Sequence, residues 1–225
     1  MQYYPVNLDI RHRSCLVVGG GQVGARKVGT LLKCGGRVTV VSPQATPGIV
    51  ELADAGDIVL KQRPYRPSDL EGMFLVIGAT DDEKLNRQIH ADAEGRNLLC
   101  NIADRPKICN FILPAIFRRG DFTLAISTAG KSPAFAKYIR KRLEDEFGPE
   151  YGELLDLMGA IRLKLLAKAH EPEVHKPLFE ALIREGLLSL VKNRDIDGID
   201  ALLEQVLGPG YTYHGLIPTD RPTEG

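Results

Sequence analysis

A short apolar run that leads directly into closely spaced glycines restricts the fold of this chain more than any other feature. Ser14–Val18 has the length and apolar character of a buried strand. It is followed at once by Gly19, Gly21 and Gly24, in the spacing G-x-G-x-x-G. Apolar residues then recur at helical spacing until a glycine pair at 35–36. A strand, a glycine turn and a helix in this order are typical of a dinucleotide-binding Rossmann domain.

Each glycine of the motif has a physical role in such a site. Gly19 permits the tight turn, Gly21 lets the backbone approach a pyrophosphate, and Gly24 lets the helix pack closely on the strand. The start of the helix then offers free N–H groups and a positive dipole end to the phosphates. The motif therefore predicts a dinucleotide cofactor bound over these residues.

Strand and helix signals continue to alternate after this unit, which is the pattern of a parallel α/β sheet. After residue 113 the pattern changes to two short strands, a basic helix that begins at Pro133, and a region with helical periodicity alone. We predict further strands at 37–41, 58–60, 74–78, 97–102, 111–113 and 122–127. The predicted division is a Rossmann domain at 1–113, a small α/β region at 114–147, a helical domain at 148–208, and a loose tail at 209–225.

The end of the second predicted strand departs from the usual dinucleotide fingerprint. Where an acidic residue normally holds the ribose hydroxyls, the chain has Ser42, Pro43 and Gln44. We expect Ser42 and the backbone around Pro43 to accept these hydrogen bonds instead. No arginine is next to Ser42 in the sequence to bind a 2′-phosphate, so we predict NAD rather than NADP.

Polar residues also follow the fourth and fifth predicted strands, at the edge where open α/β sheets bind ligands. Thr80 follows the fourth strand, and Asn101 and Asp104 lie at the end of the fifth. We expect the nicotinamide to face these loops, with Asp104 as the base that takes a proton while hydride leaves the substrate. In the other interpretation Asp81 and Asp82 cap the next helix, and Asp104 is a turn residue.

A polar loop precedes the predicted basic helix. Thr128, Lys131 and Ser132 offer hydroxyl, ammonium and backbone N–H groups, which suit a carboxylate or a phosphate, so we predict that they bind the substrate. The loop fits equally well as a strand-to-helix turn in which Ser132 is the N-cap before Pro133.

The composition argues against several classes of function. Basic and acidic residues number 29 each, so the chain lacks the excess positive charge of a nucleic-acid binder. No apolar run approaches the roughly 20 residues that span a bilayer, and the N-terminus does not resemble a signal peptide, so we expect a cytoplasmic protein. The 4 cysteines and 5 histidines lack the spacing of metal ligands, so we predict reduced thiols and no metal site.

Four motifs together give the chain a family resemblance. The sequence resembles the precorrin-2 dehydrogenase/sirohydrochlorin ferrochelatase family of siroheme biosynthesis, which matches the N-terminal half of bifunctional siroheme synthases. The resemblance extends from about Tyr4 to Leu207. The motifs that carry it are CLVVGGGQVGARKVGTLL, ATDDEKLN, LCNIADRPKICNFILPAIFRRGDFTLAIST and AGKSPAFAKYIR.

The resemblance implies an intertwined homodimer in which the α/β region at 114–147 is the dimerisation region. It implies oxidation of the tetrapyrrole precorrin-2 by NAD to sirohydrochlorin, and in many members insertion of Fe²⁺, or of Co²⁺ on a cobalamin route. Asp104 matches the aspartate that the family needs for its chemistry. Thr128 falls where the family often has a serine near the tetrapyrrole. The positions that match those lining NAD are Gln22, Val23, Pro43 and Gln44.

Two other functions fit the same residues. One is a module that binds NAD as a sensor and catalyses no reaction. The other is a dehydrogenase of this family that does not insert a metal. Turnover of NAD with precorrin-2 distinguishes the first from an enzyme. Because the sequence has no methyltransferase domain, we do not expect it to make precorrin-2 itself.

Overall fold

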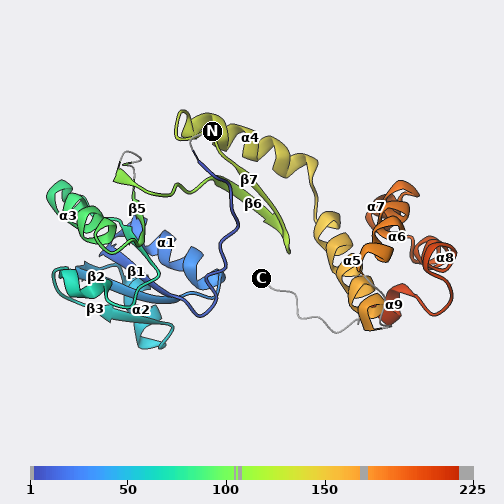
Figure 1. Cartoon of the computed structure of the whole chain (residues 1–225), viewed down its shortest axis with the longest axis horizontal. Helices are drawn as coiled ribbons and strands as arrows, with labels where there is room; N and C mark the ends of the chain where they lie inside the picture. Colours follow the sequence, from blue (N-terminus) through green and yellow to red (C-terminus); the bar gives the residue numbers. More distant parts are fainter. Residues whose placement is uncertain (1–2, 104, 106–107, 168–171, 218–225) are drawn as a thin grey trace. The chain divides into compact units, whose positions relative to one another are not determined.

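The computed structural model describes residues 3–103, 105, 108–167 and 172–217, and the side chains of all of these except 172–174. The chain divides into two compact units (Figure 1). The first consists of residues 1–113 with 129–131, and the second of residues 114–128 with 132–225. The predicted separation of a dimerisation region from a helical domain stays a prediction.

The first unit contains a parallel sheet of five strands in the order β3-β2-β1-β4-β5. The chain order reverses between β1 and β4, which are neighbours, and open sheets bind ligands at such a switch point. The predicted Rossmann-type sheet is confirmed. Its elements are β1 (Ser14–Gly20), α1 (Gln22–Lys33), β2 (Arg37–Ala45), α2 (Pro47–Asp54), β3 (Ile58–Lys61), η1 (Pro67–Leu70), β4 (Leu75–Gly78), α3 (Glu83–Glu94) and β5 (Leu99–Ile102).

Both faces of this sheet are buried, which explains its nearly continuous apolar strands. Successive residues of β1 point to opposite faces, so Val17 packs with α1 and α2 while Leu16 packs with α3 and η1. Neither side chain is exposed to solvent. The two apolar layers hold the carboxyl ends of β1, β2, β4 and β5 at one edge.

The second unit begins with an antiparallel hairpin of β6 (Ala115–Arg119) and β7 (Phe122–Ile126), followed by α4 (Pro133–Glu146). The predicted strand at 111–113 is wrong. Gly120, with φ of +57°, and Asp121 form a two-residue connection that pairs Arg119 with Phe122, so the strand lies beyond Pro114.

The helices that follow α4 in the second unit share one apolar core, which includes Leu157, Ile161, Leu182 and Leu203. Sequence periodicity predicts a helical region here, but it did not separate the seven-residue α7 or the short α9 from their neighbours. The helical C-terminal region is confirmed. Its elements are α5 (Glu150–Ala167), α6 (Pro172–Arg184), α7 (Leu187–Asn193), α8 (Ile196–Leu207) and α9 (Tyr213–Leu216).

The expectation of a loose tail is wrong for residues 209–217, and residues 218–225 lie outside the description. Tyr211 is 2% exposed and Leu216 is also buried, both in the core of the helical region. The Lys164 ammonium donates a hydrogen bond to the Gly210 carbonyl at 2.5 Å. The Pro- and Gly-rich composition of this segment favoured a loose tail, whereas the burial of Tyr211 and Leu216 fixes it to the helices.

Candidate active site

The glycine turn between β1 and α1 is closed by direct backbone contact. Gly19 has φ of +116°, and a Cβ there would lie 2.3 Å from the carbonyl oxygen of Ala79. A Cβ on Gly24 would lie 2.1 Å from the carbonyl oxygen of Gly19. Around Gly21, by contrast, nothing lies within 4 Å of the position of a Cβ. Gly19 and Gly24 allow the chain to close the turn, and Gly21 leaves space outside it.

The first turn of α1 has the features of an anion site. Gly21 is the N-cap in an extended conformation and has no side chain to cap the helix. The first helical hydrogen bond joins Ala25 N–H to the Gly21 carbonyl at 2.9 Å. Within the described residues, the N–H groups of Gln22, Val23 and Gly24 have no acceptor. Free N–H groups beside an open glycine fit a dinucleotide pyrophosphate.

The end of β2 forms the neighbouring wall of this site. The strand continues to Ala45, further than predicted, and Ser42 is buried within it. The Ser42 hydroxyl donates a hydrogen bond to the Gln44 carbonyl at 2.6 Å, so its lone pairs are left to accept one. Pro43 and Gln44 are exposed. The roles of these three residues toward a ribose stay predictions.

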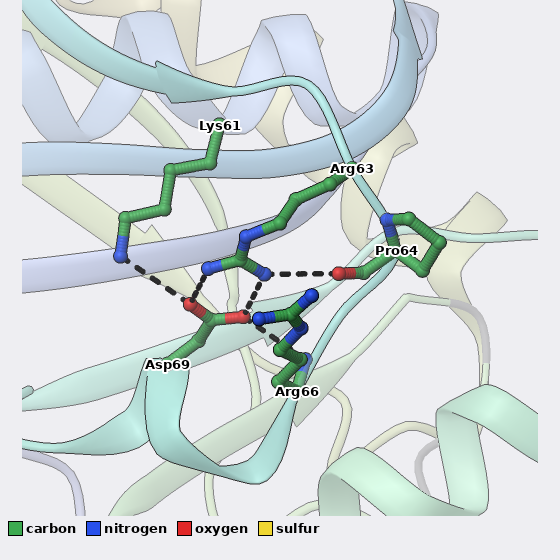
Figure 2. Close-up of polar contacts among 5 residues, drawn as sticks. All are labelled: Lys61, Arg63, Pro64, Arg66 and Asp69. Atoms are coloured by element: carbon green, nitrogen blue, oxygen red, sulfur yellow. Dashed lines mark hydrogen bonds and ion pairs between the residues drawn. The ribbon is translucent and has the colours of Figure 1, made fainter.

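A cluster of charges on β3 and η1 lies beside the end of β2. Strand pairing places Lys61 opposite Val41, one residue before Ser42. The buried carboxylate of Asp69 accepts hydrogen bonds from Arg63 at 2.6 and 2.8 Å and from Lys61 at 3.3 Å (Figure 2). The Arg63 guanidinium is the main cause that lowers the pKa of Asp69 to about 2. Lys61 is distant from Ser42 in the sequence because it comes from the neighbouring strand, and its charge is paired with Asp69.

The loop after β4 is held by an amide and a carboxylate. The buried Asn86 of α3 donates to the Thr80 carbonyl at 2.8 Å, and the Thr80 hydroxyl donates to the Asn86 side-chain oxygen at 3.0 Å. The Asp82 carboxylate accepts from the N–H groups of Lys84 at 2.8 Å and Leu85 at 3.1 Å. The capping interpretation of Asp82 is therefore confirmed. A contact of Thr80 with the cofactor stays a prediction.

Asn101 is buried on β5 and its amide is already engaged. Its Nδ2 donates to the carbonyl oxygen of Phe111 at 3.0 Å. This hydrogen bond joins β5 to Phe111, which lies beyond the loop that follows the strand. A role of Asn101 toward the substrate stays a prediction, and its side-chain oxygen is the atom left for it.

Asp104 lies outside the described residues, but the residues on either side of it are described. Ala103 N–H donates to the Gly78 carbonyl at 2.8 Å, and Arg105 N–H donates to the Ile102 carbonyl at 3.2 Å. Ala103 and Arg105 therefore lie at the carboxyl ends of β4 and β5, the edge that carries the glycine turn.

The loop before α4 has the capping geometry that the sequence offered as one interpretation. The Ser132 hydroxyl oxygen accepts from the Phe135 N–H at 3.2 Å, and the Thr128 hydroxyl oxygen accepts from the Ser132 N–H at 3.1 Å. The side chain of Lys131 is exposed. Thr128 and Ser132 belong to the second unit. Substrate binding by these three residues stays a prediction.

Sequence reasoning overlooked three residues of this edge: Gly78, Asn86 and Asn110. A Cβ on Gly78 would lie 2.6 Å from Cδ1 of Ile102, so the end of that side chain would have to shift if another residue replaced the glycine. Asn86 and Asn110 are ordinary polar residues of a helix and a loop in the sequence. Their roles become visible only when their partners, which lie 6 to 12 residues away, are known.

The cysteines are free thiols. Burial raises the pKa of Cys15 to about 11 and that of Cys100 to about 12. In the described part of the chain, no three His, Cys, Asp or Glu side chains are grouped so that they could hold a metal ion. The described helices include none that is both long and apolar enough to span a bilayer.

Comparison with protein families gives two matches. Residues 6–115 match the family described as "Putative NAD(P)-binding", and residues 119–146 match "Sirohaem biosynthesis protein central". The siroheme synthase of Thioalkalivibrio sulfidiphilus is 36% identical over 210 residues, which cover 93% of this chain and 43% of that protein. That of Methylococcus capsulatus is 37% identical over 205 residues, covering 91% and 43%. The chain spans less than half the length of these curated relatives.

A solved structure named SirC, precorrin-2 dehydrogenase, matches over nearly its whole length. It has a TM-score of 0.75 and 30% sequence identity, and the match covers 91% of this chain and 99% of that one. The chain belongs to the precorrin-2 dehydrogenase family. The predicted family resemblance is confirmed, as is the combination of a Rossmann-type sheet with a helical C-terminal region. In this member of the family, the NAD(P)-binding match covers all five strands of the parallel sheet.

Proposed function

We propose that this chain oxidises precorrin-2 to sirohydrochlorin with NAD as the hydride acceptor. The observation that carries the proposal is one sheet edge with two features. An open glycine turn with free helix N–H groups follows β1, and the segment that bears Asp104 follows β5. The matching solved structure is named as a precorrin-2 dehydrogenase, and this name supports the choice of substrate.

The residues present fit a dinucleotide. Gly21 leaves open space for a pyrophosphate, and the N–H groups of Gln22 and Val23 are free to donate to it. Ser42 can accept a hydrogen bond from a ribose hydroxyl while it donates to Gln44. Bound NAD supplies a carbon that accepts the hydride. The residues that we assign to its binding are Gly19, Gly21, Gln22, Val23, Gly24, Ser42, Pro43, Gln44 and Thr80.

The chain itself supplies the groups that handle protons and carboxylates. Loss of a hydride from the tetrapyrrole is accompanied by loss of a proton, and the Asp104 carboxylate is the base that takes it. The exposed Lys131 ammonium donates charge-assisted hydrogen bonds to a substrate carboxylate. The hydroxyls of Thr128 and Ser132 accept from N–H groups, so their hydrogens are available to the substrate. Asn101 is assigned to the substrate through its side-chain oxygen.

Further parts of the proposal follow from the family. Insertion of Fe²⁺ or Co²⁺ into sirohydrochlorin removes two pyrrole protons, and Asp104 can serve again as the base, with the metal as a substrate. We also assign a homodimer and a cytoplasmic location. The reduced state of all four cysteines agrees with a reducing compartment.

Anaerobic turnover tests the reaction directly. The chain is mixed with enzymatically generated precorrin-2 and NAD, and optical spectra are recorded before and after addition of Fe²⁺ or Co²⁺. We expect NADH to form together with the spectrum of sirohydrochlorin. Metal uptake faster than in an enzyme-free mixture would establish metal insertion as a second activity, and uptake at the control rate would limit the enzyme to the dehydrogenase step.

Asp104→Ala separates binding from chemistry. We expect this variant to bind NAD like the unmodified chain and to form NADH far more slowly. NAD binding without any NADH formation by the unmodified chain would contradict the dehydrogenase and favour a sensing module. Full activity of folded Asp104→Ala would contradict the assignment of the base alone.

A further inference from the structure

Two cations beside the end of β2 come from the next strand and from the loop that follows it. Strand pairing places Lys61, the last residue of β3, opposite Val41. Arg63 follows in the loop toward η1. Neighbouring strands lie about 4.8 Å apart, so the Lys61 backbone lies close to the end of β2, which holds the adenosine ribose in dinucleotide sites. The two nicotinamide dinucleotides differ at this ribose, because NADP carries a 2′-phosphate there and NAD does not.

Arg63 is committed to a buried carboxylate. Its guanidinium donates to the two oxygens of Asp69 at 2.6 and 2.8 Å and to the Pro64 carbonyl at 2.9 Å (Figure 2). Asp69 is 2% exposed and also accepts from the Arg66 backbone N–H at 3.0 Å. Turning Arg63 toward a ligand would leave a buried charge without its main partner, which is strongly unfavourable. The pair therefore fixes an ionised carboxylate within reach of Lys61.

Lys61 is the cation that remains accessible. Its ammonium donates to Asp69 at 3.3 Å, and 39% of its side chain is exposed. Within the described residues only one of its three N–H groups has an acceptor. A phosphate bound to this ammonium would share it with Asp69 and would be repelled by that carboxylate, whereas a neutral ribose hydroxyl would not.

The hydroxyl of Ser42 favours the same dinucleotide. It donates to the Gln44 carbonyl at 2.6 Å, so it offers a ligand only its lone pairs. A ribose hydroxyl has a hydrogen to donate to these lone pairs, but a phosphate dianion has none. Two independent features of this edge, the engaged hydrogen of Ser42 and the pairing of Lys61, therefore disfavour a 2′-phosphate.

We propose that Asp69 determines cofactor specificity, because it keeps Lys61 paired so that the site favours NAD over NADP. The inference rests on the dinucleotide site of the proposed function. It goes beyond that function, because it assigns the choice of cofactor to a buried residue outside the set that we assign to NAD binding. Two cations and one carboxylate leave the cluster with one positive charge, and loss of the carboxylate leaves it with two.

The first test titrates NADH and NADPH, whose own fluorescence reports binding, into the unmodified chain and into Asp69→Asn. We expect the unmodified chain to bind NADH more tightly than NADPH. In Asp69→Asn the ratio of the two affinities should shift about five- to tenfold toward NADPH, because a negative charge has been removed near the 2′-phosphate. A ratio that stays constant, even if both affinities fall, would overturn the inference.

Asp57→Asn is the matched control. Asp57 directly precedes β3, so it lies at the opposite edge of the sheet from Lys61, and its side chain is exposed. The variant removes the same charge from the other end of the same strand. We expect its ratio of affinities to equal that of the unmodified chain. A shift as large as that in Asp69→Asn would attribute the effect to net charge and overturn the inference.

Lys61→Gln tests the same pair from the other side and keeps Asp69 bound to Arg63. The glutamine amide can still donate to Asp69, but the carboxylate is less neutralised, so the ratio of affinities should shift severalfold toward NADH. In the double variant Asp69→Asn/Lys61→Gln the cluster has one positive charge again, and most of the gain in NADPH affinity should disappear. A gain that persists in full would show that Asp69 does not act through Lys61 and would refute the proposal.

These titrations use no tetrapyrrole, so their outcome is separate from that of the proposed reaction. Equal affinity of the unmodified chain for NADH and NADPH would overturn the specificity role of Asp69 and leave the dehydrogenase intact. Selective binding of NADH, without any NADH formation from precorrin-2 and NAD, would contradict the dehydrogenase and leave the role of Asp69 standing.

Discussion

The loops after β1 and β5 lie at the same edge of one sheet, yet they are held by opposite means. The first is closed by the absence of side chains, because Gly19 and Gly24 bring backbone atoms into contact. The second is closed by the presence of particular side chains, Asn110 and Cys109, which bind the backbone of β5. The comparison teaches that the first loop tolerates no added carbon at Gly19 or Gly24, whereas the second tolerates changes of volume but depends on its hydrogen bonds.

The largest effect is expected where a carbon atom enters the glycine turn. In Gly24→Ala the new Cβ would lie 2.1 Å from the Gly19 carbonyl oxygen, so α1 has to move away from β1. We expect a loss of about 3 kcal/mol in the free energy of unfolding, measured by urea denaturation. Gly29→Ala on the same helix is the control, since nothing lies within 4 Å of its Cβ, and it should be neutral or stabilising. Equal stability of the two variants would contradict the steric account of the turn.

The next effect concerns a third loop of this edge, between β3 and η1, which is held by charge. Asp69→Asn should reduce the free energy of unfolding by about 2 kcal/mol at neutral pH. In the folded chain the pKa of Asp69 is lowered from 3.8 to about 2 by Arg63, so the stabilisation is complete above pH 4 and is lost as the pH falls toward 2. Denaturation from pH 7 to pH 2 should therefore show the difference between the two proteins shrinking below pH 4.

Glu83→Gln is the matched control for that series. Glu83 pairs with Arg87 at 2.8 Å and with Arg105 at 3.6 Å, but all three side chains are more than half exposed, so these pairs contribute little. Their loss should change the free energy of unfolding by less than about 0.5 kcal/mol. A pH-independent defect in Asp69→Asn would indicate disturbed packing rather than a lost ion pair.

How far the sequence predicts this edge depends on how far apart the interacting residues lie along the chain. Gly24 packs on the Gly19 carbonyl within six residues, so the glycine spacing predicts this turn, whereas the contact of Gly19 with Ala79 is long-range. The Asp82 cap acts over two and three residues and is equally visible. Such short-range geometry is the part of the fold that residue patterns describe well.

Longer-range partners explain what the sequence did not reveal. Strand pairing places Lys61 beside the end of β2, and the Asn110 side chain accepts a hydrogen bond from Cys100 N–H on β5, ten residues earlier. The tail at 209–217 is anchored by Tyr211, whose partners lie on α5 and its neighbouring helices. Apolar runs also predict a strand near 111–113, but the two-residue hairpin connection, a local geometric constraint, places it at Ala115–Arg119.

Gly21 lies in the same glycine loop after β1, but unlike Gly19 and Gly24 it makes none of the close backbone contacts that close the loop. Nothing lies within 4 Å of its Cβ position, so Gly21→Ala should leave the free energy of unfolding nearly unchanged. If the pyrophosphate occupies that space, the affinity for NAD should fall about tenfold, or about 1.4 kcal/mol, in a titration of protein fluorescence. Unchanged NAD affinity in Gly21→Ala would mean that the cofactor does not approach the turn at this residue.

The smallest effect is expected at the loop after β4, where a single carboxylate caps the helix that follows. Asp82→Ala removes a carboxylate that accepts two N–H groups of α3, so we expect a loss of about 1 kcal/mol in the free energy of unfolding. Asp81→Ala is the matched control, because Asp81 is exposed and its carboxylate makes no hydrogen bond within the described residues. Neither variant should change the rate of NADH formation, because the cap acts on the helix and Asp104 is the assigned base. A slower reaction in Asp82→Ala at full stability would place this carboxylate in the chemistry and move the proton acceptor from the loop after β5 to the loop after β4.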